Sequence, residues 1–74
     1  MNPKTDHAAH LLAIDYVNRC RRDFRAAMAA RDAIENCASP EWRAAHATAR
    51  TVAVALDNAF EHAYSVGLAR PYWA

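Results

Sequence analysis

The sequence predicts an all-α fold, an antiparallel hairpin of two long helices, on the strength of three observations. Much of the apolar fraction of 54% is alanine, the residue with the highest helix propensity. The 74 residues include one glycine and three prolines, so few residues interrupt a helix. Apolar residues recur at alternating spacings of three and four in both halves of the chain, which is the spacing of one helix face.

The first helix is expected over residues 3–37. Asn2 is a good N-cap residue and Pro3 suits the first helical position, and Thr5–Asp6 is a second possible cap. From there to Asn36 the chain contains no further glycine or proline. One face of this helix, here named the first seam, consists of His10, Ala13, Val17, Cys20, Phe24, Ala27, Arg31 and Ile34.

The second helix is expected over residues 40–66. Ser39 is a good N-cap, Pro40 suits the first position, and Glu41 places negative charge at the positive end of the helix dipole. Its corresponding face, the second seam, consists of Trp42, Ala45, Ala49, Val52, Leu56, Ala59, Ala63 and Val66.

The C-terminal tail, residues 67–74, begins with a helix stop signal. Gly67 suits the left-handed position after a helix, and Leu68 would then pack back in a Schellman motif. Pro71 prevents continuation, and two large aromatic residues, Tyr72 and Trp73, follow it. We expect these two side chains to cover the open end of the hairpin. The alternative is that they anchor a partner, because such residues are enriched at binding hot spots.

The short connection requires the helices to run antiparallel, with the two seams in contact. A fold about Ala38 predicts four opposed pairs: Phe24 with Val52, Cys20 with Leu56, Val17 with Ala59, and Ile34 with Trp42. Arg31 is unusual because it occupies a seam position. We expect its side chain to extend outward along its apolar stem. The alternatives are a pair with Glu35 or with a carboxylate of a second chain.

Several apolar residues flank the seams and would stay uncovered in a lone hairpin: Ile14, Tyr16, Met28, Ala53, Ala55 and Phe60. A chain this short builds little core by itself. Pairing two hairpins would bury the flanking residues, so a homodimeric four-helix bundle is expected. In architecture alone, such a dimer resembles the plasmid RNA-binding Rop bundle, and no residue role follows from that likeness.

The main charge feature is the stretch RCRRDFR, residues 19–25. Arg19, Arg22 and Arg25, here named the arginine cluster, would lie on the outer face of the first helix and could hold an acidic protein surface or phosphates. A solvated helix face is the simpler interpretation, because Asp15 and Asp23 are interleaved and Asp15 is four residues before Arg19. The net charge of +1 is low for a nucleic-acid-binding protein.

No cofactor or metal ion is expected. His7 and His10 could meet His62 and Glu61 across the hairpin, but this spacing lacks the established zinc patterns, and polar surface histidines are the preferred interpretation. Cys20 and Cys37 would lie in or at the end of one helix, about 25 Å apart and too far for a disulfide, so free thiols are expected. Neither a phosphate-binding loop nor a catalytic carboxylate pair is recognisable, and an enzyme is not expected.

The sequence therefore favours a small non-enzymatic protein-interaction module, a regulator or inhibitor that docks through a helix face. The alternative is an RNA- or DNA-binding hairpin that uses the arginine cluster. The candidate partner-binding residues are Arg19, Arg22, Arg25, Tyr72 and Trp73. A cytoplasmic location is expected, because no stretch resembles an export signal or a membrane span.

Overall fold

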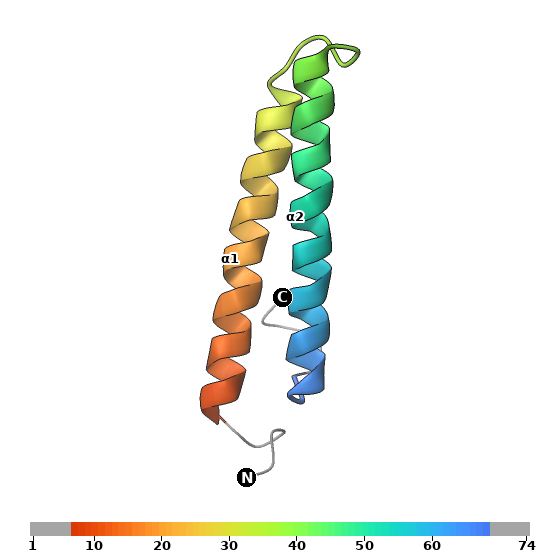
Figure 1. The fold of residues 1–74 in the computed structure, drawn as a ribbon. Helices are drawn as coiled ribbons and strands as arrows, with labels where there is room; N and C mark the ends of the chain where they lie inside the picture. The colour runs from red at the N-terminus through yellow and green to blue at the C-terminus, as the bar shows by residue number, and fades with distance from the viewer. Residues whose placement is uncertain (1–6, 69–74) are drawn as a thin grey trace.

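The structure is an all-α hairpin, as predicted. The computed structural model describes residues 7–68, in which α1 spans His7–Asp32 and α2 spans Pro40–Ser65. The two helices run antiparallel and pack side by side along their length (Figure 1). Within the described residues, neither helix has the length and apolar character needed to cross a bilayer.

The first helix ends earlier than predicted, at Asp32 instead of residue 37. The Ile34 N–H bonds to the Arg31 carbonyl, so the last turn tightens. Beyond it, the Asn36 side chain accepts the Ala38 N–H at 2.9 Å, and the Ser39 hydroxyl donates to the Asn36 carbonyl at 2.7 Å. These local bonds give the backbone an alternative to further helix. The predicted start, over residues 3–6, lies outside the described residues.

Ser39 begins the second helix as predicted. Its backbone is extended, with φ −73° and ψ 155°, as expected for a residue that precedes proline. Its hydroxyl oxygen accepts the N–H of Trp42 at 3.1 Å, and Pro40 follows at the first helical position. The cap satisfies one of the free N–H groups at the start of α2.

The C-terminal end of α2 is a Schellman motif, which confirms the prediction for Gly67 and Leu68. Gly67 has a φ of 95°, a left-handed conformation that glycine adopts without a Cβ clash. Its N–H bonds to the Tyr64 carbonyl, and the Leu68 N–H bonds to the Ala63 carbonyl, both at 3.0 Å. The Leu68 side chain packs against the core.

The core lies along the two predicted seams. Its fully buried members all belong to them and are Ala13, Val17, Cys20, Ala49, Ala59 and Ala63. The remaining seam residues are half-buried, and none is exposed. The predicted register agrees with a bond across the open end of the hairpin, where His10 Nε2 donates to the Val66 carbonyl at 2.6 Å. These two residues lie equally far along the chain from Ala38.

The prediction for Arg31 was wrong in its direction, and the alternative pair with Glu35 does not form. Its side chain is only 18% exposed and stays between the helices. Nε pairs with Asp32 at 3.0 Å rather than with Glu35, and Nη1 donates to His46 Nδ1 at 3.2 Å. The guanidinium carbon lies 5.8 Å from the Trp42 ring centre. Because these neighbouring residues satisfy the guanidinium, the Arg31 side chain does not need to extend into solvent.

Trp42 completes the arrangement around Arg31. Its ring stacks on that of His46, with centroids 4.8 Å apart and an interplanar angle of 9°. Because a guanidinium can only donate, His46 Nδ1 is the acceptor, and the ring proton of a neutral His46 sits on Nε2. We name Arg31, Trp42 and His46 the loop-end cluster, because they tie the two helices together near the connection.

Candidate functional site

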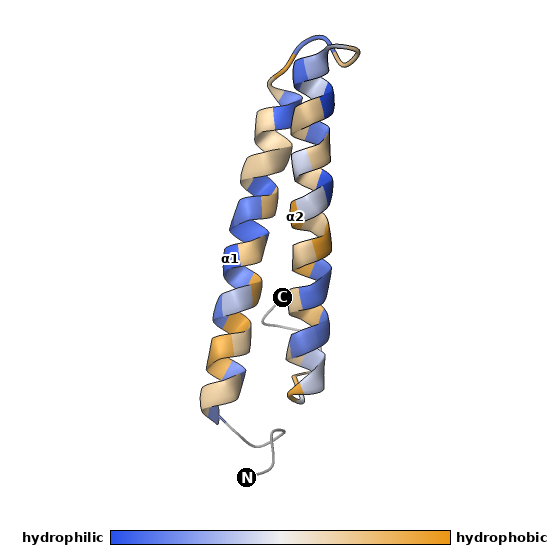
Figure 2. Ribbon diagram, in the orientation of Figure 1, coloured by the Kyte–Doolittle hydropathy of each residue, from blue (hydrophilic) through white to orange (hydrophobic). Residues whose placement is uncertain are grey.

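The three residues of the arginine cluster are exposed on α1, as predicted for an outer helix face. Figure 2 shows the corresponding hydrophilic bands at the middle of this helix. Arg21, in the same run, behaves differently: it is half-buried, and its guanidinium carbon lies 5.9 Å from the centre of the Phe60 ring. Helical periodicity therefore assigns neighbouring arginines to different surroundings.

The ion pair between Asp15 and Arg19 forms as predicted, with Oδ2 and Nε 3.0 Å apart. Both side chains are more than half exposed, so the pair contributes little to the stability of the hairpin. Among residues 7–68, Arg22 and Arg25 have no acidic side chain within ion-pair distance. Within residues 7–68, two guanidinium groups of the cluster are therefore not held by an acidic side chain.

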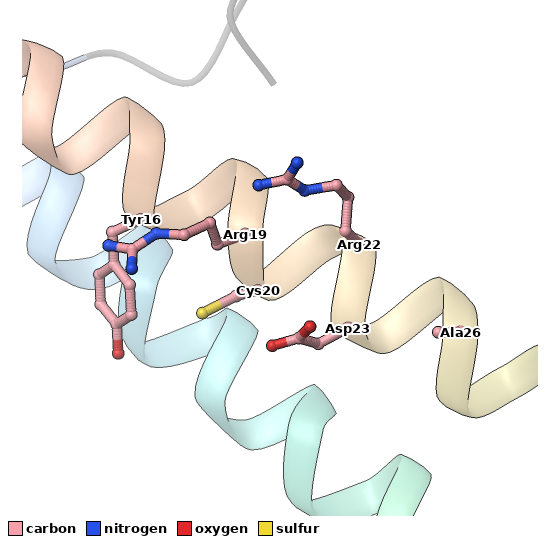
Figure 3. A pocket seen from close by; sticks show the side chains of 6 residues that line it. All are labelled: Tyr16, Arg19, Cys20, Arg22, Asp23 and Ala26. Carbon is pink, nitrogen blue, oxygen red and sulfur yellow. The ribbon is translucent and has the colours of Figure 1, made fainter.

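A shallow surface depression of about 540 Å³ lies beside two of the arginines (Figure 3). The lining residues, all from α1, are Tyr16, Arg19, Cys20, Arg22, Asp23 and Ala26. The Cys20 side chain, 8% exposed, forms part of the floor, whereas Arg19, Arg22 and Asp23 are exposed. In Figure 3, Arg19 extends toward Tyr16, and Asp23 projects on the other side of Cys20.

The chemistry of the depression suits a single anionic group with a short apolar stem. A guanidinium presents a fork of N–H donors that matches a carboxylate, and the Tyr16 ring offers apolar contact area. Residues 15–25 contain four arginines and two aspartates, a net charge of +2. The carboxylates of Asp15 and Asp23 would repel a closely spaced row of phosphates more than one isolated carboxylate.

The structure brings only part of the predicted site together. Arg19 and Arg22 line the depression, whereas Arg25 does not. Tyr72 and Trp73 lie outside the described residues. The sequence interpretation missed Tyr16 and Asp23, although the series at positions 16, 19, 23 and 26 has the spacing of one helix face.

The histidines and cysteines have no shared site in the described part of the chain. His10 bonds to a backbone carbonyl and His46 belongs to the loop-end cluster. Within residues 7–68, no group of three or more potential metal ligands comes together. Both thiols are free: Cys20 is buried, and Cys37 is exposed in the connection rather than within α1.

Comparison with known proteins gives no relative from which a role could be transferred. No protein-family model, no curated protein and no solved structure matches the chain.

Proposed function

We propose that this chain is a non-enzymatic interaction module, a regulator or inhibitor that docks a protein partner through the exposed face of α1. The observation that carries the proposal is the pair of arginines, Arg19 and Arg22, at the rim of the α1 depression. One of them, Arg22, has no acidic neighbour among residues 7–68. The depression is open and shallow, which suits contact with a protein surface better than enclosure of a small substrate.

The partner chemistry that fits this face is an acidic protein segment. Charged groups on a partner steer association and fix its orientation. The net charge of +2 over residues 15–25 is enough to favour acidic segments, and it is low for a protein that follows a nucleic-acid backbone.

Fluorescence anisotropy with two labelled probes tests this function. One probe is a peptide with a single glutamate flanked by apolar residues, and the other is a single-stranded RNA of similar length. We expect the purified chain to bind the peptide at low salt, and Arg19→Ala with Arg22→Ala to weaken binding by about tenfold, or about 1.4 kcal/mol. The control, Arg43→Ala with Arg50→Ala, removes the same charge from exposed positions of α2 and should change binding little.

The RNA arm decides between the two candidate functions. Neutralised phosphates release counterions, so RNA binding through the cluster would fall steeply with salt concentration. The nucleic-acid alternative replaces the proposal if three results are found together. The chain then binds RNA more strongly than peptide, the RNA binding falls with salt, and Arg22→Ala with Arg25→Ala abolishes it. This alternative is tested because Arg22 and Arg25 are exposed and could contact phosphates.

We also propose that two copies pair as a four-helix bundle. The proposal is supported by the small size of the hairpin core. Four of its six buried residues are alanine, and Val17 is the largest fully buried side chain. Alanine removes little apolar area from water, so one hairpin gains little burial energy against its conformational entropy. Larger apolar side chains, including Met28 and Phe60, remain half-buried and could be covered by a second copy.

Size-exclusion chromatography with light scattering tests the pairing. We expect a mass near twice the monomer mass of 8.2 kDa at micromolar concentration. A monomer mass throughout the micromolar range would contradict the dimer and leave the proposed docking function of α1 intact.

A further inference from the structure

One side of the hairpin carries a largely apolar surface, with one arginine in it, that both helices share. Arg21 of α1 lies over the Phe60 ring of α2, so the helix face that contains Arg21 adjoins the face that contains Phe60. Residues seven apart on a helix share a face, which adds Ile14 and Met28 to Arg21, and Ala53 to Phe60. Tyr64, one turn after Phe60, has its ring centre 6.4 Å from that of Phe60. We name this surface the Phe60 face; its members are Ile14, Arg21, Met28, Ala53, Phe60 and Tyr64.

The Phe60 face is poorly covered within one chain. Tyr64 is 39% exposed, and the other five members are half-buried. The composition resembles the centre of a protein interface, where aromatic residues, methionine and arginine are enriched and other charged residues are depleted. The equivalent positions on the other side of the seams are mixed: Asp23, Thr48 and His62 are exposed there, beside Tyr16 and the half-buried Ala55.

The hairpin exposes more surface than a compact domain of its mass. The chain exposes 5237 Å². A compact monomer of this mass would expose about 4,500 Å². Each partner buries about 800 Å² in a standard protein interface, and the extended hairpin has surface of that order available. The radius of gyration, 15.5 Å, likewise exceeds the value of about 11 Å for a compact domain of this length.

We infer that the Phe60 face is the surface through which the hairpin pairs with a second copy of itself. This inference rests on the proposed dimer and specifies its interface. A two-fold pairing brings the same patch of both partners into one interface. Each half-buried residue of the patch is then covered on both copies. It also leaves the α1 depression free for a partner, because Tyr16 and Asp23 lie outside the Phe60 face.

Charge insertion at this face tests the inference. Ala53→Glu would bury a carboxylate twice per dimer, and we expect the dimer dissociation constant to rise about 100-fold or more. Tyr64→Glu provides a second variant at a site already exposed in the hairpin. The matched control is Thr51→Glu: residues two apart on a helix point in nearly opposite directions, and Thr51 is exposed. Sedimentation velocity gives the dissociation constants, and circular dichroism shows that each variant stays helical.

Each outcome supports the inference or overturns it. Helical monomers from either Phe60-face variant, beside a Thr51→Glu dimer, support it. If the wild-type chain is a dimer and both Phe60-face variants are dimers too, the assignment of this face is overturned. The proposed dimer itself is then still supported. Dissociation by Thr51→Glu alone assigns the interface to the opposite side. A monomeric wild-type chain overturns the proposed dimer together with its interface.

Discussion

At the scale of single residues, Trp42 links the two helices near the connection. It stacks on His46 and lies beneath the guanidinium of Arg31. Because the ring is half-buried, we expect Trp42→Ala to lower the free energy of unfolding by about 2–3 kcal/mol, less than the roughly 3–5 kcal/mol of a fully buried aromatic. Urea denaturation followed by circular dichroism measures this. The control, Val54→Ala at a 60% exposed site, should change stability by less than about 0.5 kcal/mol.

His10 has the corresponding position at the open end. Its Nε2–H donates to the Val66 carbonyl, one of the carbonyls that a helix C-terminus leaves without an intrahelical partner. We expect His10→Ala to lower the free energy of unfolding by about 1 kcal/mol, the net contribution of one such hydrogen bond. His7→Ala removes an exposed histidine three residues away and should be nearly neutral in the same denaturation experiment. Equal losses from both variants would contradict a specific role for His10.

The residue-scale predictions failed where several side chains act together. The sequence places Arg31 on an apolar seam, and periodicity alone cannot reveal that Asp32, His46 and Trp42 supply its partners. The same limit applies to the α1 depression. Spacing identifies the arginines of an exposed face, but the lining by Tyr16 and Asp23 depends on side-chain directions that only coordinates provide.

At the scale of elements, the helix ends show which signals are reliable. Ser39–Pro40 and Gly67–Leu68 were predicted correctly because each pair satisfies a specific backbone requirement: an N-cap acceptor and a left-handed residue. The end of α1 was misplaced by five residues because Asn36 was treated as a permissible helix residue. Its side chain instead bonds to the Ala38 N–H, a competition that helix propensity does not capture.

The N-cap of α2 gives a prediction at this scale. Ser39→Ala removes the oxygen that accepts the Trp42 N–H, and we expect a loss of about 1 kcal/mol in the free energy of unfolding. Ser39→Asp keeps an acceptor at the same position and should retain most of the stability. Guanidinium denaturation of the three proteins makes the comparison. If the aspartate variant is as unstable as the alanine variant, the Ser39 hydroxyl matters through its bond to Asn36 and not as a cap.

At the scale of the whole molecule, the seam pattern correctly predicted which residues form the core. The same pattern does not determine whether two hairpins pair. All six buried residues occupy seam positions. The same pattern that specifies the contact between α1 and α2 says little about the outer faces, because many positions there are alanine, which fits either a solvent-exposed face or a close helix contact. The dimer is therefore inferred from uncovered surface and a small core, both properties of the folded hairpin.

The C-terminal tail gives the last prediction, and it concerns how the open end of the hairpin is closed. Leu11 and Leu12 of α1 are 55% and 71% exposed, and Leu68 packs against the core. We predict that Tyr72 and Trp73, which lie outside the described residues, cover this end. Truncation after Arg70 should then lower the free energy of unfolding by about 1–3 kcal/mol, because aromatic contacts at a partly exposed site are lost.

Thermal unfolding of the truncated chain measures this loss, and a Trp42→Phe background isolates the emission of Trp73. A covering role predicts blue-shifted emission that a soluble quencher reaches slowly. A red-shifted, freely quenched Trp73 and an unchanged melting temperature would instead indicate that the tail anchors a partner. In that case the truncated chain should keep its stability and lose binding, because exposed aromatic residues at a chain end contribute more to an interface than to the fold.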